Sequence, residues 1–158
     1  MTDRELNIAL REMARSAGLC DAWYEEWKDN DTLDSCMERY IRGFDFVKNN
    51  DWPSLEFSRE HFTKRIDLLH KHHIYFDEEV NITDVENGFY AFIGHCKAYM
   101  EVEGMKVVTI YCRHDSVVDV KATGGAIVFV KYYDQSAGIT ATDGFSKIRR
   151  YVYNTEKK

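Results

Sequence analysis

The hydrophobic residues of the amino-terminal half recur at steps of three and four, the spacing that places them on one face of an α-helix. Thr2 and Glu5 have the spacing of a capping box, and a hydrophobic stripe leads from there to Gly18, where we expect the first helix to end. Trp23 and Trp27 lie one turn apart and indicate a short second helix. The chain is therefore predicted to begin with helical structure.

Two further helices are predicted downstream. The strongest hydrophobic stripe begins after Thr32 and ends at Asn49-Asn50-Asp51, and Gly43 inside it can allow a neighbouring side chain to approach closely. Pro53, the only proline, fits the first turn of a fourth helix, where its missing N–H costs nothing. That helix is expected to end at the run His70-Lys71-His72-His73.

The pattern changes after the histidine run, and this change sets the predicted boundaries. Residues 74–87 alternate between hydrophobic and polar and end in turn residues, so we interpret them as an extended connection. They follow a helical portion of about four helices, residues 1–73, and precede a β-repeat, residues 88–153. Residues 154–158 form a charged tail.

The carboxy-terminal part repeats every ten residues. Residues that favour turns or tolerate a left-handed backbone recur in register, at Gly94, Gly104, His114, Gly124, Asp134 and Gly144. Between the turns lie three columns of mainly hydrophobic or small residues, which begin at Ala98, Met100 and Val102 and recur at intervals of ten. Because the columns lie two residues apart, they point to one side of a strand, and we predict that this side is the inside.

Two architectures satisfy this period. In an antiparallel β-meander or barrel consecutive strands are neighbours, whereas in a β-solenoid each coil of about 20 residues holds two strands, and strands of successive coils pair in parallel. We favour the solenoid because its narrow interior requires small and β-branched side chains and its coils require constant spacing. Two-residue hairpin turns are also sparse, at Asn87-Gly88 and Asp143-Gly144. The predicted fold class is α+β, a helical segment followed by a short β-solenoid.

A solenoid separates its outward residues into two faces. One is acidic and includes Tyr99, Glu101, Glu103, Asp119, Lys121, Thr123, Ile139 and Asp143. The other includes Thr109 and is aromatic and basic through eight predicted contact residues, Tyr111, Arg113, Phe129, Lys131, Tyr133, Arg149, Tyr151 and Tyr153. Arg113, Tyr133 and Tyr153 would stack there in one cation–π column. Either the helices fold back on this face, or it is a surface for a protein partner or for self-association.

Composition narrows the classes of function. The chain has 158 residues, 44% of them hydrophobic, which fits one compact domain. Lys and Arg number 21 against 27 Asp and Glu, and the net charge of −6 disfavours nucleic acid and anionic membranes. No segment approaches the ~20 hydrophobic residues of a membrane span. Four cysteines without CxxC pairing, Cys20, Cys36, Cys96 and Cys112, indicate reduced core thiols in a cytoplasmic protein.

Two groups of residues carry the types that chemistry needs. His70, His72 and His73 could bind a metal, but adjacent histidines at a helix end more often complement the helix carbonyls. Arg113-His114-Asp115 contains the types that a hydrolase uses, but neighbours on a strand end point in different directions, so a turn is the preferred interpretation. We therefore expect no catalytic residue, no metal and no cofactor.

Several short pieces carry a resemblance to known sequences. They are Tyr40-x-x-Gly43-x-Asp45-Phe46, Asp51-x-Pro53-Ser54, Phe62, His73-Ile74-Tyr75, Asn87-Gly88 and Arg113-His114-Asp115-Ser116. They resemble an uncharacterised family of small proteins from anaerobic gut bacteria and their mobile elements and prophages, over most of the chain beyond residue 20. The resemblance implies a helical portion followed by a β-rich repeat and a phage or mobile-element setting, and it carries over no catalytic residue.

The pattern favours a non-enzymatic protein-interaction or assembly protein, such as an inhibitor or immunity-type factor, that acts through the aromatic and basic face. One alternative is a small hydrolase-like enzyme that uses the Arg113-His114-Asp115 turn with a histidine of residues 70–73. Another is a nucleic-acid-binding protein that uses Arg113, Lys131 and Arg149. The enzyme requires its histidines and Asp115 to converge in one pocket, whereas the interaction protein and the nucleic-acid-binding protein require their side chains to line one face.

Overall fold

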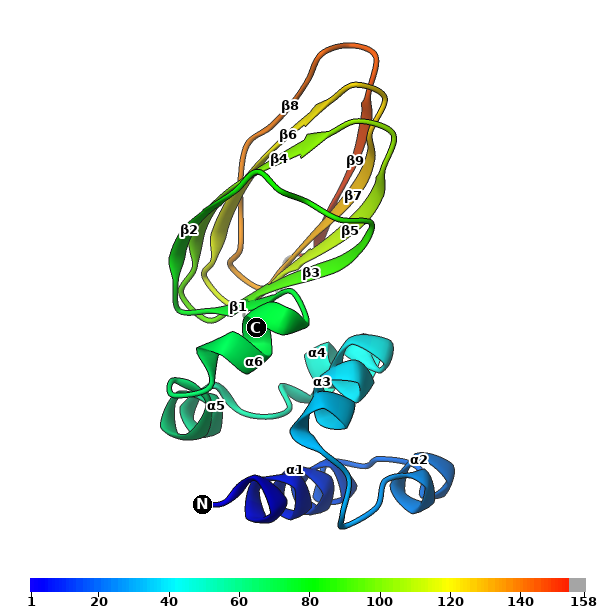
Figure 1. The fold of residues 1–158 in the computed structure, drawn as a ribbon, viewed down its shortest axis with the longest axis vertical. Coiled ribbons are helices and arrows are strands. Elements are labelled where there is room, and N and C mark those ends of the chain that lie inside the picture. The colour runs from blue at the N-terminus through cyan, green and yellow to red at the C-terminus, as the bar shows by residue number, and fades with distance from the viewer. Residues whose placement is uncertain (154–158) are drawn as a thin grey trace. The chain divides into compact units, whose positions relative to one another are not determined.

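The computed structural model describes residues 1–153, which form two compact units. The first, Met1–His72, is helical, and the second, which begins at His73, is a β-solenoid (Figure 1). The predicted α+β fold class is thereby confirmed. The predicted charged tail, residues 154–158, lies outside the described residues.

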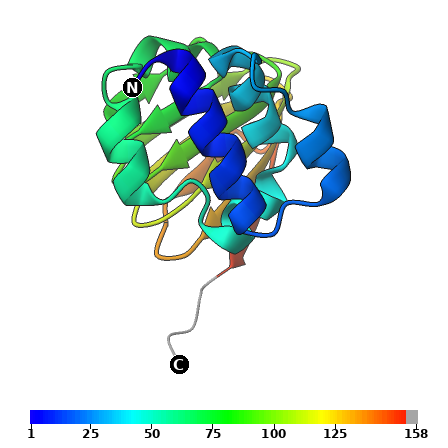
Figure 2. The same ribbon diagram turned by 90° about the horizontal axis from the view of Figure 1, so that it is seen from below.

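The helical unit contains six helices, all within the described part of the chain. They are α1 (Asp3–Ser16), α2 (Asp21–Glu26), α3 (Leu33–Arg42), α4 (Phe44–Asn50), α5 (Leu55–Phe62) and α6 (Ile66–Lys71). Seen from below, α1 lies between α2 and α5 (Figure 2). The predicted capping box is confirmed, because the Thr2 N–H donates to Glu5 Oε2 at 2.6 Å and the Glu5 N–H donates to Thr2 Oγ1 at 3.2 Å.

The expectation of about four helices was too low, because two of the predicted helices are each broken in two. The stripe after Thr32 breaks at Gly43, where an added Cβ would lie 3.1 Å from the Trp23 ring, so the predicted close approach is present. The last predicted helix is divided into α5 and α6. Ser54 is the N-cap of α5, so Pro53 precedes the helix instead of lying in its first turn. A hydrophobic stripe continues across such breaks and does not reveal them.

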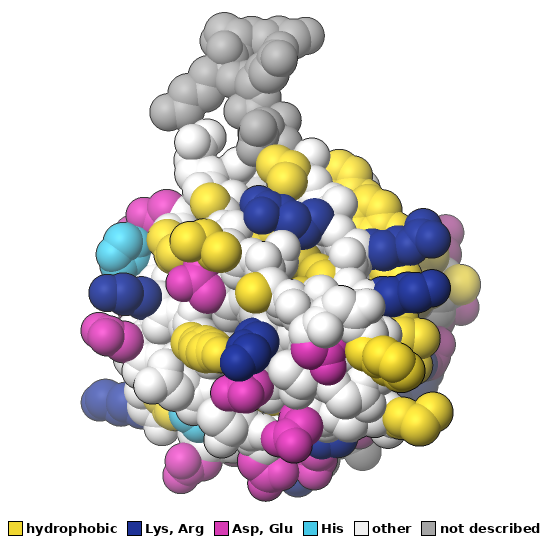
Figure 3. Space-filling model, turned by 90° about the horizontal axis from the view of Figure 1, so that it is seen from above, with side chains coloured by type: hydrophobic (Ala, Val, Ile, Leu, Met, Phe, Trp, Pro, Cys, Tyr) yellow, Lys and Arg dark blue, Asp and Glu magenta, His cyan; other side chains and the backbone are white. Residues whose placement is uncertain are grey.

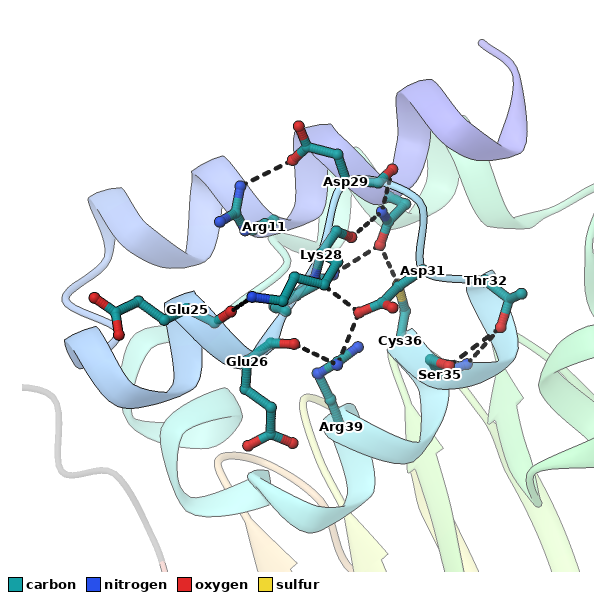
Figure 4. Close-up of polar contacts among 12 residues, drawn as sticks. Arg11, Glu25, Glu26, Lys28, Asp29, Asp31, Thr32, Ser35, Cys36 and Arg39 are labelled. Carbon is teal, nitrogen blue, oxygen red and sulfur yellow. Dashed lines mark hydrogen bonds and ion pairs between the residues drawn. The ribbon is translucent and has the colours of Figure 1, made fainter.

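A buried polar side chain, Asn7, connects the helical unit. Its Oδ1 accepts from Trp27 Nε1 at 2.7 Å and from the Cys36 thiol at 3.1 Å. Its Nδ2 donates to the carbonyls of Lys28 and Asp29 at 3.0 and 3.1 Å. Figure 4 shows the ion pairs nearby, of Arg11 with Asp29 and of Arg39 with Asp31. One residue of α1 therefore joins the segment after α2 to the first turns of α3.

The solenoid consists of two parallel sheets among the described residues. Sheet A contains β1 (Ile74–Phe76), β3 (Gly88–Ile93), β5 (Val107–Cys112), β7 (Ile127–Tyr133) and β9 (Lys147–Tyr153), and sheet B contains β2 (Glu79–Ile82), β4 (Lys97–Glu103), β6 (Val117–Thr123) and β8 (Thr140–Thr142). From Gly88 onward each residue pairs with the one twenty positions later, as Val108 does with Val128. Sequential strands alternate between the sheets (Figure 1), which confirms the solenoid and excludes the meander.

The solenoid begins earlier than the repeat predicted. Residues 74–87, expected to be an extended connection, hold β1 and β2 and form the first coil. Ile74 pairs with Ala91 and Glu79 with Lys97, which are offsets of seventeen and eighteen residues instead of twenty. A search for a ten-residue period cannot detect a coil of this length.

The predicted interior and turns are present. Val108, Ile110 and Cys112 of β5 are fully buried in the core, together with the matching positions of β4, β6 and β7. All six predicted turn positions have positive φ, from 57° at His114 to 89° at Gly104. Cys36, Cys96 and Cys112 are buried as expected, but Cys20 is exposed because it is the N-cap of α2 and carries its side chain outside the core.

Candidate functional site

The outward face of sheet A collects the predicted aromatic and basic residues. The register aligns Tyr111, Lys131 and Tyr151 in one column, Phe129 with Arg149 in a second, and Tyr133 with Tyr153 in a third. Arg113 directly follows the end of β5. On the side of the molecule that sheet A occupies, Lys and Arg side chains alternate with hydrophobic ones (Figure 3). We call this surface the sheet A face.

A shallow hollow lies in the sheet A face. Its volume is about 400 Å³, and it is lined by Phe89, Thr109, Tyr111, Phe129, Lys131, Tyr151 and Tyr153. All of the lining residues belong to the solenoid, and they come from β3, β5, β7 and β9. Five of the eight residues predicted for this face therefore line a single concave site.

Lys131 is held at the centre of the hollow by aromatic rings. Its ammonium group lies 5.4 Å from the centroid of the Tyr111 ring on one neighbouring strand and 6.0 Å from that of Tyr151 on the other. Phe89 stacks on Tyr111 from the preceding coil, at a centroid distance of 6.0 Å and an interplanar angle of 12°. Both ring faces of Tyr111 are thus covered, so the ring presents its edge and hydroxyl group to solvent.

Arg113 and Tyr133 were predicted as direct contacts for a partner, and the structure corrects this. Their exposed fractions are 3% and 7%. The Arg113 guanidinium lies 3.8 Å from Asp134, and the Tyr133 ring stacks on Tyr153 at a centroid distance of 4.9 Å, which is the aromatic half of the predicted column. Because both side chains are buried, they offer almost no area to a partner.

One lining residue, Phe89, was missed, and Thr109 was placed on this face but not among the predicted contacts. Phe89 is 46% exposed and is the largest hydrophobic side chain of β3 that reaches solvent. It pairs with Thr109, and Thr109 pairs with Phe129. Extending this column back by one coil would have identified Phe89, but no strand before residue 97 was searched for outward residues.

The two sheets differ in charge as well as in aromatic content. From β3 onward the described outward residues of sheet A include the cations Lys131, Lys147 and Arg149 and no Asp or Glu. The outward residues of β4 and β6 in sheet B include three acids, Glu101, Glu103 and Asp119, beside the two cations Lys97 and Lys121. The net charge of −6 therefore conceals a locally positive surface, and the local charge governs contact at short range.

The Arg113-His114-Asp115 turn connects successive coils. His114 Nδ1 accepts from the Gly94 N–H at 3.0 Å, and the His114 N–H donates to Asp134 at 3.0 Å. Asp115 pairs with His95 at 2.9 Å on the surface. These hydrogen bonds support the interpretation of this segment as a turn, because the imidazole nitrogen that a base would need already accepts from the backbone.

The histidines at the end of the helical unit have separate partners. His72 pairs with Asp34 at 2.8 Å, and the hydrogen bonds from Lys71 and His72 lower the pKa of that carboxyl group. His73 stacks on Tyr90 at 4.2 Å and pairs with Glu86 at 3.3 Å. Within residues 1–153 no group of three or more His, Cys, Asp and Glu side chains is arranged to hold a metal ion.

The buried thiols are in environments that suppress reactivity. Burial raises the pKa of Cys36 to about 12, and it also raises the pKa values of Cys96 and Cys112. A thiol must lose its proton to act as a nucleophile. These three cysteines are therefore core residues, as the sequence predicted.

Comparison of the chain with protein-family models, with curated proteins and with solved structures finds no match. The resemblance to a family from gut bacteria and their mobile elements therefore stays a prediction. Among the described helices, none is both long and hydrophobic enough to span a membrane. The geometry of the sheet A face is the observation from which a function can be argued.

Proposed function

We propose that the chain is a non-enzymatic protein-interaction protein that binds a protein partner through the hollow of the sheet A face. The observation that carries this proposal is the hollow itself, in which Lys131 is held between two tyrosines on a surface without acidic side chains. Aromatic side chains and Arg are enriched at protein interfaces whereas Lys is depleted there, so the cluster of rings around Lys131 carries the argument. Inhibition, immunity to a toxin or assembly of a mobile-element particle, in the cytoplasm, are roles that such a face would serve.

The orientation of the rings favours a protein over a nucleic acid or a sugar. Bases and sugars are held on aromatic residues by stacking on an open ring face. Tyr111 has Phe89 on one face and Lys131 on the other, and Tyr133 and Tyr153 stack on each other. At Tyr111 and Lys131 the hollow instead offers a ring edge, a hydroxyl group and an ammonium group, which suit a carboxylate flanked by hydrophobic side chains. The partner should therefore present acidic and hydrophobic residues together.

Site-specific photocrosslinking tests this proposal. A benzophenone side chain would replace Phe129 in the hollow, and Tyr99, which faces outward from sheet B, is the matched control position. We expect a crosslinked protein from position 129 and not from position 99. The partner, or a second copy of the chain if self-association is the function, would then be purified and its affinity measured directly.

Two substitutions sharpen the result. Phe129→Ser and Lys131→Glu should each lower the affinity for the purified partner about tenfold or more, because removal of a central anchor costs ~2 kcal/mol or more of binding free energy. Tyr99→Ser, on the opposite sheet, should leave the affinity unchanged. Equal affinity of all three variants would show that the hollow is not the binding site.

A further inference from the structure

The last strand of sheet A has an edge that can accept another strand. Within the described residues β9 is the terminal strand, and β7 is its neighbour in the sheet. The Lys147 N–H donates to the Ala126 carbonyl on the β7 side at 2.9 Å. Since successive N–H groups of a strand point to opposite sides, the N–H and C=O groups of Ile148, Arg150 and Val152 face away from β7. An unpaired edge of this kind is a template for strand addition.

The interior columns of the solenoid emerge at this edge. Val130 and Tyr132 of β7 are 0% and 1% exposed, but Arg150 and Val152, which follow them in the same columns, are exposed. Val152 is a hydrophobic side chain with 52% of its surface in contact with solvent. A further strand would cover the columns of Ile148, Arg150 and Val152 in the way that β9 covers those of β7.

Arg150 is a cation in a column that is otherwise hydrophobic in the preceding coils. Its guanidinium lies 5.3 Å from the centroid of the Tyr132 ring. Tyr132 crosses the core and donates from its hydroxyl group to the Val118 carbonyl at 2.7 Å. Gly138 leaves the space for this contact, because a Cβ there would lie 1.8 Å from the Val118 oxygen. The hydrophobic interior thus ends at Tyr132, and a positive charge stands directly above it.

The charge of β9 specifies what the edge can accept. Lys147, Arg149 and Arg150 lie within seven residues, and among the described residues no acidic side chain forms an ion pair with any of them. Two β9 edges brought together would place six cations side by side, which disfavours a second copy of this chain. An acidic strand would meet complementary charge along the same edge.

We propose that the β9 edge binds an extended acidic segment of a partner protein, which adds to sheet A as its next strand. The segment would place hydrophobic residues over Ile148 and Val152 and an acidic residue over Arg150. The main-chain hydrogen bonds would supply affinity and the central charge would supply specificity. This site adjoins the hollow, which Tyr151 and Tyr153 of β9 line, but it uses the alternate residues of β9 and does not depend on the function of the hollow.

A pair of synthetic peptides tests this proposal with the whole chain. The first is Ser-Val-Thr-Glu-Thr-Val-Ser, which has the required pattern in either strand direction, and the second carries Lys in place of Glu. Fluorescence anisotropy of the labelled peptides should show that the Glu peptide binds at least tenfold more tightly than the Lys peptide. Added salt should reduce the difference, because it screens the charge pair.

Substitutions on the protein separate recognition from folding. Arg150→Glu should reverse the preference so that the Lys peptide binds more tightly, and Arg150→Gln should abolish the preference. Lys121→Glu, which makes the same charge change on the outer surface of β6, should leave the preference unchanged. Binding of neither peptide to the folded protein, or equal binding of both, would overturn the proposal.

Hydrogen–deuterium exchange identifies the occupant of the edge. The amides of Ile148, Arg150 and Val152 should exchange rapidly in the dilute protein and become protected when the Glu peptide is added. Protection that is already complete in the dilute protein would show that the edge is covered and overturn the proposal. Protection that rises with protein concentration would identify a second copy as the occupant and would also overturn it.

Discussion

The helical unit and the solenoid are stabilised in different ways. In the helical unit a single side chain, Asn7, forms hydrogen bonds with four other residues. In the solenoid the same contact recurs in each coil, as Val108, Val128 and Ile148 show in one column. Stacked coils contact their immediate neighbours alone, so damage should stay local in the solenoid and spread widely in the helical unit.

The largest effect is expected in the core of the solenoid. Ile110 is fully buried in the middle coil, so Ile110→Ala should lower the free energy of unfolding of the solenoid by ~2–5 kcal/mol through lost burial and the cavity left behind. Urea denaturation measures the loss, and hydrogen exchange should rise mainly in β3, β5 and β7. Val107→Ala, on the outer surface of the same strand, should change stability by less than ~0.5 kcal/mol.

A substitution in the helical unit is expected to cost less unfolding free energy but to affect amide exchange in more elements. Asn7→Ala removes the acceptor of the buried Trp27 Nε1 proton and should cost ~1–3 kcal/mol of unfolding free energy. Exchange should accelerate in α1, in the segment after α2 and in α3 at once. Asn49→Ala, at an exposed position of α4, is the control. Faster exchange confined to α1 would contradict the interpretation of Asn7 as the common connection.

The smallest effect concerns pH and one turn of the solenoid. Asp143 accepts from the N–H groups of Ser146, Gly124 and Phe145, and these bonds lower its pKa to about 2. A lowered pKa in the folded state contributes stability above the unfolded value of ~3.9, and this contribution is lost as the pH falls toward about 2. The protection factor of the Gly124 amide, which is the exchange rate of an unfolded chain at the same pH divided by that of the folded protein, should therefore fall over that window, and Asp143→Asn should remove this pH dependence. Glu101→Gln, on β4, should leave it in place.

The sequence predicted the solenoid well because its repeat is periodic and the periodic residues are also the structural ones. All six turn positions adopt the expected left-handed backbone, including the non-glycine residues His114 and Asp134. The first coil escaped detection because its offsets to the next coil are seventeen and eighteen residues. The breaks in the helices escaped because hydrophobic periodicity does not report local backbone changes such as the one at Gly43.

The candidate site was predicted in outline and not in depth. Alternation along a strand shows which side a residue occupies, and it correctly grouped Tyr111, Lys131 and Tyr151. It does not show whether neighbouring side chains cover that residue, so the burial of Arg113 and Tyr133 was not foreseen. The hollow is formed by side chains from four strands, and the register is needed to know which of them are neighbours.

The constant length of the later coils has an evolutionary consequence. Duplication of a twenty-residue coil would preserve every interior column and lengthen the sheet A face by one strand spacing, about 4.8 Å. An insertion of a single residue within a strand would instead exchange interior and exterior positions up to the next turn. Genes for such chains should therefore change length in whole coils, because each added coil extends the sheet A face without disturbing the existing columns.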